Sequence, residues 1–353
     1  MIKDRPGVTV PSSERGTPPV PAPPRKTFIK RHSVFVYYVL AFVISWGGIV
    51  LVIVGGRSAV PATQEQFDRL MPFAIPFMLL GPGTAGMVMT GLADGRAGYR
   101  QLIARFLRWQ ASAGWYAVAL LTAPLVFTAV ALALSLSSPE YLPGIVRTSE
   151  KAGFLLVGTV PALLVGVLEE LGWTGFAMPR LRIRHGLLTT GLTMGLLWGA
   201  WHLLTNDLWA AGTISGALPV GRFVTVYGLS LLLTQLLVFR VLMVCVYEHT
   251  GSLLLLMLMH ASYAFSTFVL QPLQMAQVPL LIFSVTTAAV MWMVVAAIAA
   301  ANGGHLARRQ SKNTRLVSGT LASGQSRRRN LPLGQGRLLR CRRSAASGSG
   351  TRC

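Results

Sequence analysis

Eight long apolar runs constrain this chain more than any other feature of its sequence. A helix that crosses a hydrocarbon core about 30 Å thick needs roughly 18 or more such residues, and each run is long enough. Hydrophobic residues make up 52% of the chain and charged residues only 12%, which excludes an ordinary soluble domain. The sequence therefore predicts an all-α, polytopic membrane protein with about eight transmembrane helices. The runs lie at approximately 34–54, 71–92, 115–136, 154–178, 187–204, 223–247, 252–270 and 279–301.

The net charge is +21, and most of the basic residues responsible for it lie between and outside the apolar runs. Lysine and arginine gather before the first run, in the loops at 96–108 and 180–184, and after the last run. By the positive-inside rule these segments face the cytoplasm, so we expect both termini there, as an even number of spans requires. A composition rich in alanine, glycine and arginine favours a bacterial plasma membrane.

Two polar segments flank the apolar region and divide the chain into three parts. Residues 1–32 are basic and rich in proline, which predicts a disordered leader without a cleavable signal peptide. Residues 33–301 form the predicted transmembrane domain. Residues 302–353 hold twelve Lys/Arg and no acid, which predicts a disordered tail that either contacts anionic lipid headgroups or is simply solvated. No aromatic residue is interleaved with its arginines, so nucleic acid is not an expected partner.

Ionisable residues inside the apolar runs are the candidates for function, because burying them in a membrane is costly. Only two of the eleven acids, Glu169 and Glu170, lie deep within a run. Two of the six histidines, His202 and His260, do so as well. Carboxylates and imidazoles of this kind build general bases, water-activating pairs and metal sites.

The spacing of these residues predicts that they meet. Glu169 and His202 lie at similar distances from the turn near Gly186, and His260 lies about nine residues beyond the turn at Gly251. At 1.5 Å per residue, each is roughly 14 Å below the same surface. Adjacent glutamates point about 100° apart on a helix, so at least one faces a cavity or a neighbouring helix. The alternatives are structural histidines in the packing and a glutamate pair that anchors the arginines at 180–184.

Three motifs around these residues resemble the CPBP family, the CAAX proteases and bacteriocin-processing intramembrane proteases. The family pattern is EExxxR, then FxxxH, then HxxxN or a small residue. The resemblance covers residues about 75–270 and is strongest over 165–265. The motifs read EELGWTGFAMPRL at 169–181, LLWGAWHL at 196–203 and GSLLLLMLMHAS at 251–262.

The resemblance implies a role for each candidate and a core in spans four to seven, at about 150–270. Glu169 would be the general base that activates the attacking water, and Glu170 would support it. His202 would bind or polarise that water or a metal, and His260 would complete the site. Glu169, His202 and His260 also have the residue types of a zinc site with two histidines and one glutamate. Metalloprotease and glutamate-dependent mechanisms therefore both stay open.

The chain departs from the family pattern at three positions. Thr174 stands in place of the arginine, Trp198 in place of the phenylalanine, and Ala264 in place of the asparagine. Trp198 is expected still to pack against His202. Thr174 can hydrogen-bond Glu170 without neutralising it. Loss of the asparagine removes a possible oxyanion donor, a change that costs around 10²–10³ in rate in other proteases.

The resulting hypothesis is an intramembrane endopeptidase that hydrolyses a peptide bond in a cavity open to the cytoplasm. Its expected partners are a peptide or lipid-modified protein substrate and membrane lipids. A catalytically impaired scaffold or immunity protein is the main alternative. A transporter with a Glu/His proton relay is less favoured, because the chain shows no repeated halves with interrupted helices.

Overall fold

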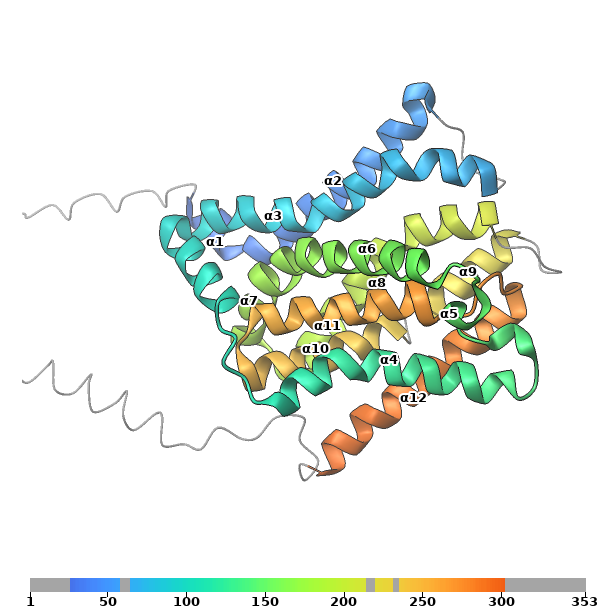
Figure 1. Ribbon diagram of the computed structural model, residues 1–353. Coiled ribbons are helices and arrows are strands. Elements are labelled where there is room, and N and C mark those ends of the chain that lie inside the picture. The colour runs from blue at the N-terminus through green and yellow to red at the C-terminus, as the bar shows by residue number, and fades with distance from the viewer. Residues whose placement is uncertain (1–25, 58–63, 214–219, 231–234, 302–353) are drawn as a thin grey trace, which may run out of the picture. The chain divides into compact units, whose positions relative to one another are not determined.

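The structure, a computed structural model, describes residues 26–57, 64–213, 220–230 and 235–301. Within these ranges it contains no β-strand, and seven of its helices are long and apolar enough to cross a membrane (Figure 1). The predicted all-α, polytopic membrane fold is therefore confirmed.

The α-helices follow one another along the chain, with short 3₁₀- and π-helical segments between them. They are α1 (Lys26–Arg31), α2 (Ser33–Val52), α3 (Gln64–Phe106), α4 (Ala113–Ser135), α5 (Gly144–Arg147), α6 (Lys151–Gly172), α7 (Met178–Arg184), α8 (Leu187–Thr213), α9 (Val220–Ser230), α10 (Leu236–Thr250), α11 (Leu253–Phe265) and α12 (Gln277–Ala301). The 3₁₀ segment η2 is Pro139–Tyr141, and the π segments are η1 (Ile53–Arg57), η3 (Trp173–Ala177) and η5 (Ser266–Leu270).

Seven of the eight predicted runs correspond to a membrane-length helix. The exception is the run at 223–247, which α9 and α10 share, with residues 231–234 outside the described residues. Neither α9 nor α10 reaches 18 residues in the described part of the chain, which accounts for the difference between eight and seven. Most of the predicted leader and the whole predicted tail lie outside the described residues, while the last residues of the leader form α1.

Three helix pairs form the framework around the three sequence motifs. Helix α2 packs on α3, α6 packs on α11, and α8 packs on α10. Figure 1 shows α6 and α11 running alongside each other, with α4 on the other side of α11. The two glutamates on α6 and the histidine on α11 are thereby brought to one interface.

Helix α3 contains the clearest break in the framework. Gly95 adopts φ 61° and ψ −145°, a conformation that favours glycine, and it separates the apolar part of α3 from a short basic helix. Arg105 on this basic helix donates to the carbonyl oxygen of Gly175 at 2.7 Å and to the Tyr247 hydroxyl at 3.3 Å. The basic helix is thus tied to η3, the segment that follows the two glutamates.

The outer faces of the long helices carry large apolar side chains. Leu125 on α4, Val157 on α6 and Leu51 on α2 are each more than half exposed. An exposed apolar surface of this kind is expected where a helix faces lipid, because lipid tails replace water as the solvent. The buried side chains therefore belong to contacts between helices.

Close contact between α6 and α11 depends on Gly166. A Cβ atom at this position would collide with the carbonyl oxygen of Met257 and the backbone nitrogen of Ala261. We expect Gly166→Ala to lower the free energy of unfolding by about 1–3 kcal/mol, as overpacking does. Thermal unfolding in detergent measures this change.

Gly153 on the same helix provides the matched control. A Cβ atom there meets nothing within 4 Å. Alanine is the better helix former by up to about 1 kcal/mol, so Gly153→Ala is expected to be neutral or slightly stabilising. Equal effects of the two substitutions would show that the α6–α11 contact does not limit stability.

Candidate active site

The two glutamates lie near the end of α6, in the turn before a π-helical segment. Both side chains are buried, Glu170 completely. The π segment η3 begins at Trp173, one turn after Glu169. Such segments are rare in helices and are frequent at functional sites. Here η3 places the Trp173 indole and the Thr174 hydroxyl next to the carboxylates.

Glu170 is held in a buried network from three other positions. Arg240 on α10 donates from Nη1 to both carboxylate oxygens, at 2.9 and 3.0 Å. His260 on α11 approaches Glu170 Oε1 with Nδ1 at 2.8 Å. The Thr174 hydroxyl donates to Oε2 of the same carboxylate, as expected from the sequence. Glu170 therefore has the partners of a structural ion pair.

Arg240 is itself fully buried, and its plane rests on an aromatic ring. Its guanidinium carbon lies 4.4 Å from the centre of the Trp198 ring, which is a cation–π contact. In the described part of the chain, Nε and Nη2 of Arg240 have no hydrogen-bond partner. The attraction to Glu170 and the stacking on Trp198 are thus what compensates for its burial.

Glu169 has a different environment from its neighbour. Its Oε2 accepts hydrogen bonds from the indole nitrogens of Trp173 at 3.2 Å and Trp198 at 3.0 Å. The same oxygen lies 3.9 Å from Nε2 of His260. The cation Arg240 contacts Glu170 and not Glu169. The two adjacent carboxylates therefore have different hydrogen-bond donors, as their divergence on the helix predicts, and His260 is the residue near both.

His260 connects the two glutamates. Since a carboxylate oxygen can only accept, the contact with Glu170 places a hydrogen on Nδ1 of His260. In the neutral ring, Nε2 then carries a lone pair on the side of Glu169. With the ring in this neutral form, Oε2 of Glu169 and Nε2 of His260 are two acceptors that lie 3.9 Å apart.

His202 lies one turn after Trp198 on α8 and borders the same region. Its Nδ1 is 3.0 Å from the carbonyl oxygen of Trp198, and the two ring centres are 5.2 Å apart. The expected packing of Trp198 against His202 is therefore confirmed. Trp198 also meets the ring of His260 at 5.0 Å, so it separates the two histidines.

A cavity of about 540 Å³ lies next to these side chains. Glu169, His202 and His260 line it, whereas Glu170 and Arg240 do not. Its wall also includes several polar side chains, among them Tyr227, Gln235, Tyr263 and Gln271. The structure thus brings all four candidate residues together and gives three of them access to a cavity.

The cavity extends away from the basic end of the helices. Arg182 forms an ion pair with Glu248 near the start of α11, so the basic turn and this end of α11 lie together. The cavity reaches residues 271–274, which follow the other end of the membrane-length helix Leu253–Leu270. The sequence led us to expect an opening on the side of the basic loops, and the described cavity extends in the opposite direction.

The zinc set expected from Glu169, His202 and His260 does not fit this arrangement. In the described part of the chain, no three His, Cys, Asp or Glu side chains are placed to hold a metal ion together. Ligand atoms of a tetrahedral zinc lie about 3.3 Å apart, while Glu169 Oε2 and His260 Nε2 are 3.9 Å apart. Metal use stays a prediction, and no chemical step below depends on it.

Sequence reasoning missed Arg240 and the role of Trp173. Arg240 is a single cation within the apolar run 223–247, so the rule that identified the glutamates and histidines would have found it if applied to cations. The indole hydrogen bond from Trp173 carries no such signal, because it depends on the local geometry of η3.

The comparison with protein families agrees with this geometry. Residues 151–266 match the family described as type II CAAX prenyl endopeptidase Rce1-like, a segment that contains both glutamates, both histidines and Arg240. No curated protein matches the chain. At the level of the family, the match supports a membrane-embedded peptidase of the CAAX type. Residues 151–266, about a third of the chain, therefore support the resemblance to the CPBP family, the CAAX-type intramembrane proteases.

Proposed function

We propose that the protein is an endopeptidase that hydrolyses a peptide bond with a water molecule activated by Glu169. One observation carries the proposal: Oε2 of Glu169 and Nε2 of His260 face each other across 3.9 Å at the wall of the cavity. Two hydrogen bonds of about 2.8 Å from one water oxygen reach across this gap. A water that donates to both groups is a stronger nucleophile than bulk water.

The chemical step uses these groups in a fixed order. The water oxygen attacks the peptide carbonyl carbon while Glu169 removes one of its protons. Glu169 then passes this proton to the amide nitrogen as the carbon–nitrogen bond breaks. The products are a carboxyl group and an amine, and the enzyme returns to its starting state.

Glu170 and Arg240 act as positioning residues in this proposal. Glu170 accepts the Nδ1 hydrogen of His260 and so fixes which nitrogen of the ring faces Glu169. Arg240, on α10, balances the charge of Glu170. In the family pattern an arginine at position 174 would supply a cation here instead. The cation is retained, although it comes from a different helix.

The oxyanion formed by the attack needs hydrogen-bond donors that Ala264 does not supply. Ala264 lines the cavity, so the position is correct but the amide is absent. Gln235 and Tyr263 line the same cavity and carry suitable donors. We propose that one of these side chains stabilises the developing charge.

We further propose that the basic end of the protein faces the cytoplasm of a bacterial cell. Helix α2 begins, and α12 ends, at this basic end, because α12 starts just after residues 271–274 and is long enough to span the membrane. Both termini are then cytoplasmic. The cavity, which reaches residues 271–274, then extends toward the opposite side of the membrane.

Labelling of single cysteines tests this orientation. In a variant that lacks the three native cysteines, Ile183→Cys and Gln274→Cys place exposed thiols at the two ends. A membrane-impermeant maleimide added to intact cells is expected to label position 274 and not position 183. Labelling of position 183 alone would reverse the proposed topology.

The substrate class we propose is a membrane-tethered peptide, with or without a prenyl group. The test is a cleavage assay with the purified protein in liposomes, in which mass spectrometry identifies new peptide termini. We expect new termini from the wild type and far fewer from His260→Ala. Chelator treatment followed by metal add-back decides separately whether the reaction requires a metal.

An impaired scaffold is the second candidate, and the substitutions at Thr174 and Ala264 favour it. It predicts a folded protein that releases no peptide fragments from any tethered substrate. It also predicts no cleavage by Ala264→Asn, the variant that restores the asparagine of the family pattern, if the loss of this asparagine is not the sole cause of inactivity. Cleavage by the wild type, lost in His260→Ala while the fold remains intact, contradicts the scaffold.

A further inference from the structure

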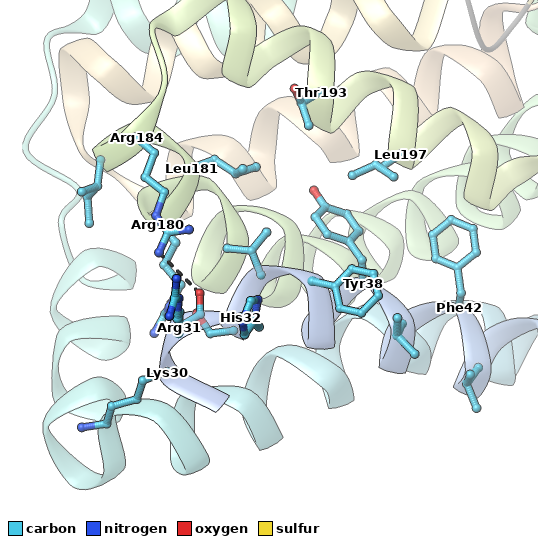
Figure 2. Close-up of a pocket in the computed structure, with 16 residues that line it drawn as sticks. Lys30, Arg31, His32, Tyr38, Phe42, Arg180, Leu181, Arg184, Thr193 and Leu197 are labelled. Carbon is cyan, nitrogen blue, oxygen red and sulfur yellow. Dashed lines mark hydrogen bonds between the residues drawn. The ribbon is translucent and has the colours of Figure 1, made fainter. Parts of the chain in front are cut away.

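A second cavity, of about 790 Å³, lies on the other side of the site helices, between α2, α7 and α8 (Figure 2). It shares no lining residue with the cavity at Glu169. The rings of Tyr38, which lines it, and Trp173 lie 5.5 Å apart and stand between it and Glu169. It is therefore a separate site with its own chemistry.

One end of this second cavity is strongly basic. Lys30, Arg31, Arg180 and Arg184 line it, and Figure 2 shows them at the same end. Arg180 pairs with Asp94, but no acidic side chain in the described ranges forms an ion pair with the other three. Arg184 donates to the carbonyl oxygen of Arg31 at 3.4 Å, which holds two of the basic residues together.

The other end of the cavity is apolar. Phe35, Val39 and Val43 line it from α2, and all three side chains are substantially exposed. Phe42 and Leu197 continue the same surface, and Figure 2 shows them away from the basic end. From residue 35 to residue 43 the helix rises about 12 Å, so the apolar wall extends well below the basic residues.

The basic residues of this cavity lie at the ends of membrane-length helices, which is where a membrane surface is expected. Lys30 and Arg31 come just before the membrane-length helix that begins at Ser33, and Arg184 ends the one that begins at Lys151. Lysine and arginine at such positions attract anionic headgroups, by about 1 kcal/mol each. A phosphate at this end would be continuous with an acyl chain along α2.

We propose that this cavity binds an anionic phospholipid. Its phosphate lies among Arg31, Arg184 and Lys30, and one acyl chain lies along Phe35 and Val43. The basic end selects a negative headgroup over a zwitterionic one, and the apolar wall selects a lipid over a free phosphate. The occupant is thus a structural lipid, bound apart from the catalytic cavity.

Lipid titration of the purified protein in detergent tests this proposal, with native mass spectrometry as the readout. We expect phosphatidylglycerol to bind more tightly than phosphatidylcholine. Arg31→Gln and Arg184→Gln are each expected to weaken phosphatidylglycerol binding by about fivefold. Val39→Trp, which fills the apolar wall, is expected to weaken it as well. Inorganic phosphate at the same concentrations is expected not to compete.

Arg100→Gln is the matched control, because Arg100 is an exposed arginine at the same basic end but outside the cavity. It removes the same charge and is expected to leave lipid binding unchanged. An equal loss in Arg100→Gln and Arg31→Gln would overturn the proposal, since the attraction would then belong to the whole basic surface. Equal affinity for the two lipids, or displacement by inorganic phosphate, would overturn it too. Unchanged thermal unfolding of the variants shows that the losses do not come from misfolding.

Discussion

Glu169→Gln is expected to slow peptide cleavage by about 10²–10⁴-fold, the usual contribution of a general base. Glutamine keeps the size of the side chain and still accepts the hydrogen bonds of Trp173 and Trp198. It cannot remove a proton from water, so kcat falls. KM is expected to change little, because Glu169 acts on the water rather than on the bound peptide. Steady-state kinetics in liposomes measures both constants.

The control for Glu169→Gln is a glutamate outside the site. Glu65 is exposed and pairs with Arg69 one turn away, so Glu65→Gln is expected to leave kcat unchanged. Glu169→Asp keeps the base but shortens its reach, and it is expected to retain more activity than the glutamine variant. Wild-type kcat in Glu169→Gln would remove Glu169 from the mechanism.

Arg240→Met is expected to lower the free energy of unfolding by about 3–5 kcal/mol, the cost of leaving a buried charge without its partner. Methionine fills much of the space of the side chain, but the carboxylate of Glu170 loses both hydrogen bonds from Nη1. The cation–π contact with Trp198 is lost as well. Equilibrium unfolding in mixed detergent micelles measures the change.

The double variant Glu170→Gln/Arg240→Met separates the charge effect from a packing effect. With both charges removed, we expect most of the lost stability to return, because Glu170→Gln removes the carboxylate that Arg240→Met leaves without its cation. Arg240→Lys is expected to be intermediate, since a lysine ammonium lacks the planar fork of a guanidinium. If the double variant is as unstable as Arg240→Met, the loss comes from packing and not from the ion pair.

The positions of the membrane helices could be predicted from the sequence because they depend on local composition. Long apolar runs form helices wherever they are placed in lipid, since each backbone group must find its partner within the segment. The run 223–247 is the exception. Its described helices, α9 and α10, are each shorter than 18 residues, and residues 231–234 lie outside the described residues, so this eighth span stays a prediction.

The meeting of Glu169 with His260 could be predicted as well, because depth in the membrane follows from the distance to a turn. The sequence does not predict which of the two glutamates lines the cavity and which forms the buried ion pair. Which of them faces the cavity depends on the rotation of α6 against α11, and hence on contacts such as that of Gly166 with Met257. The direction in which the cavity extends depends on residues that lie far apart along the chain, so it could not be derived from the sequence.

The most direct test of the central claim is mass spectrometry of peptide products formed in ¹⁸O-labelled water. Wild-type protein and Glu169→Gln are compared in equal amounts in liposomes with the same tethered peptide. We expect one ¹⁸O atom in each new carboxyl group from the wild type, and about 10²–10⁴-fold less labelled product from the variant. Equal amounts of labelled product from the two proteins would contradict water activation by Glu169.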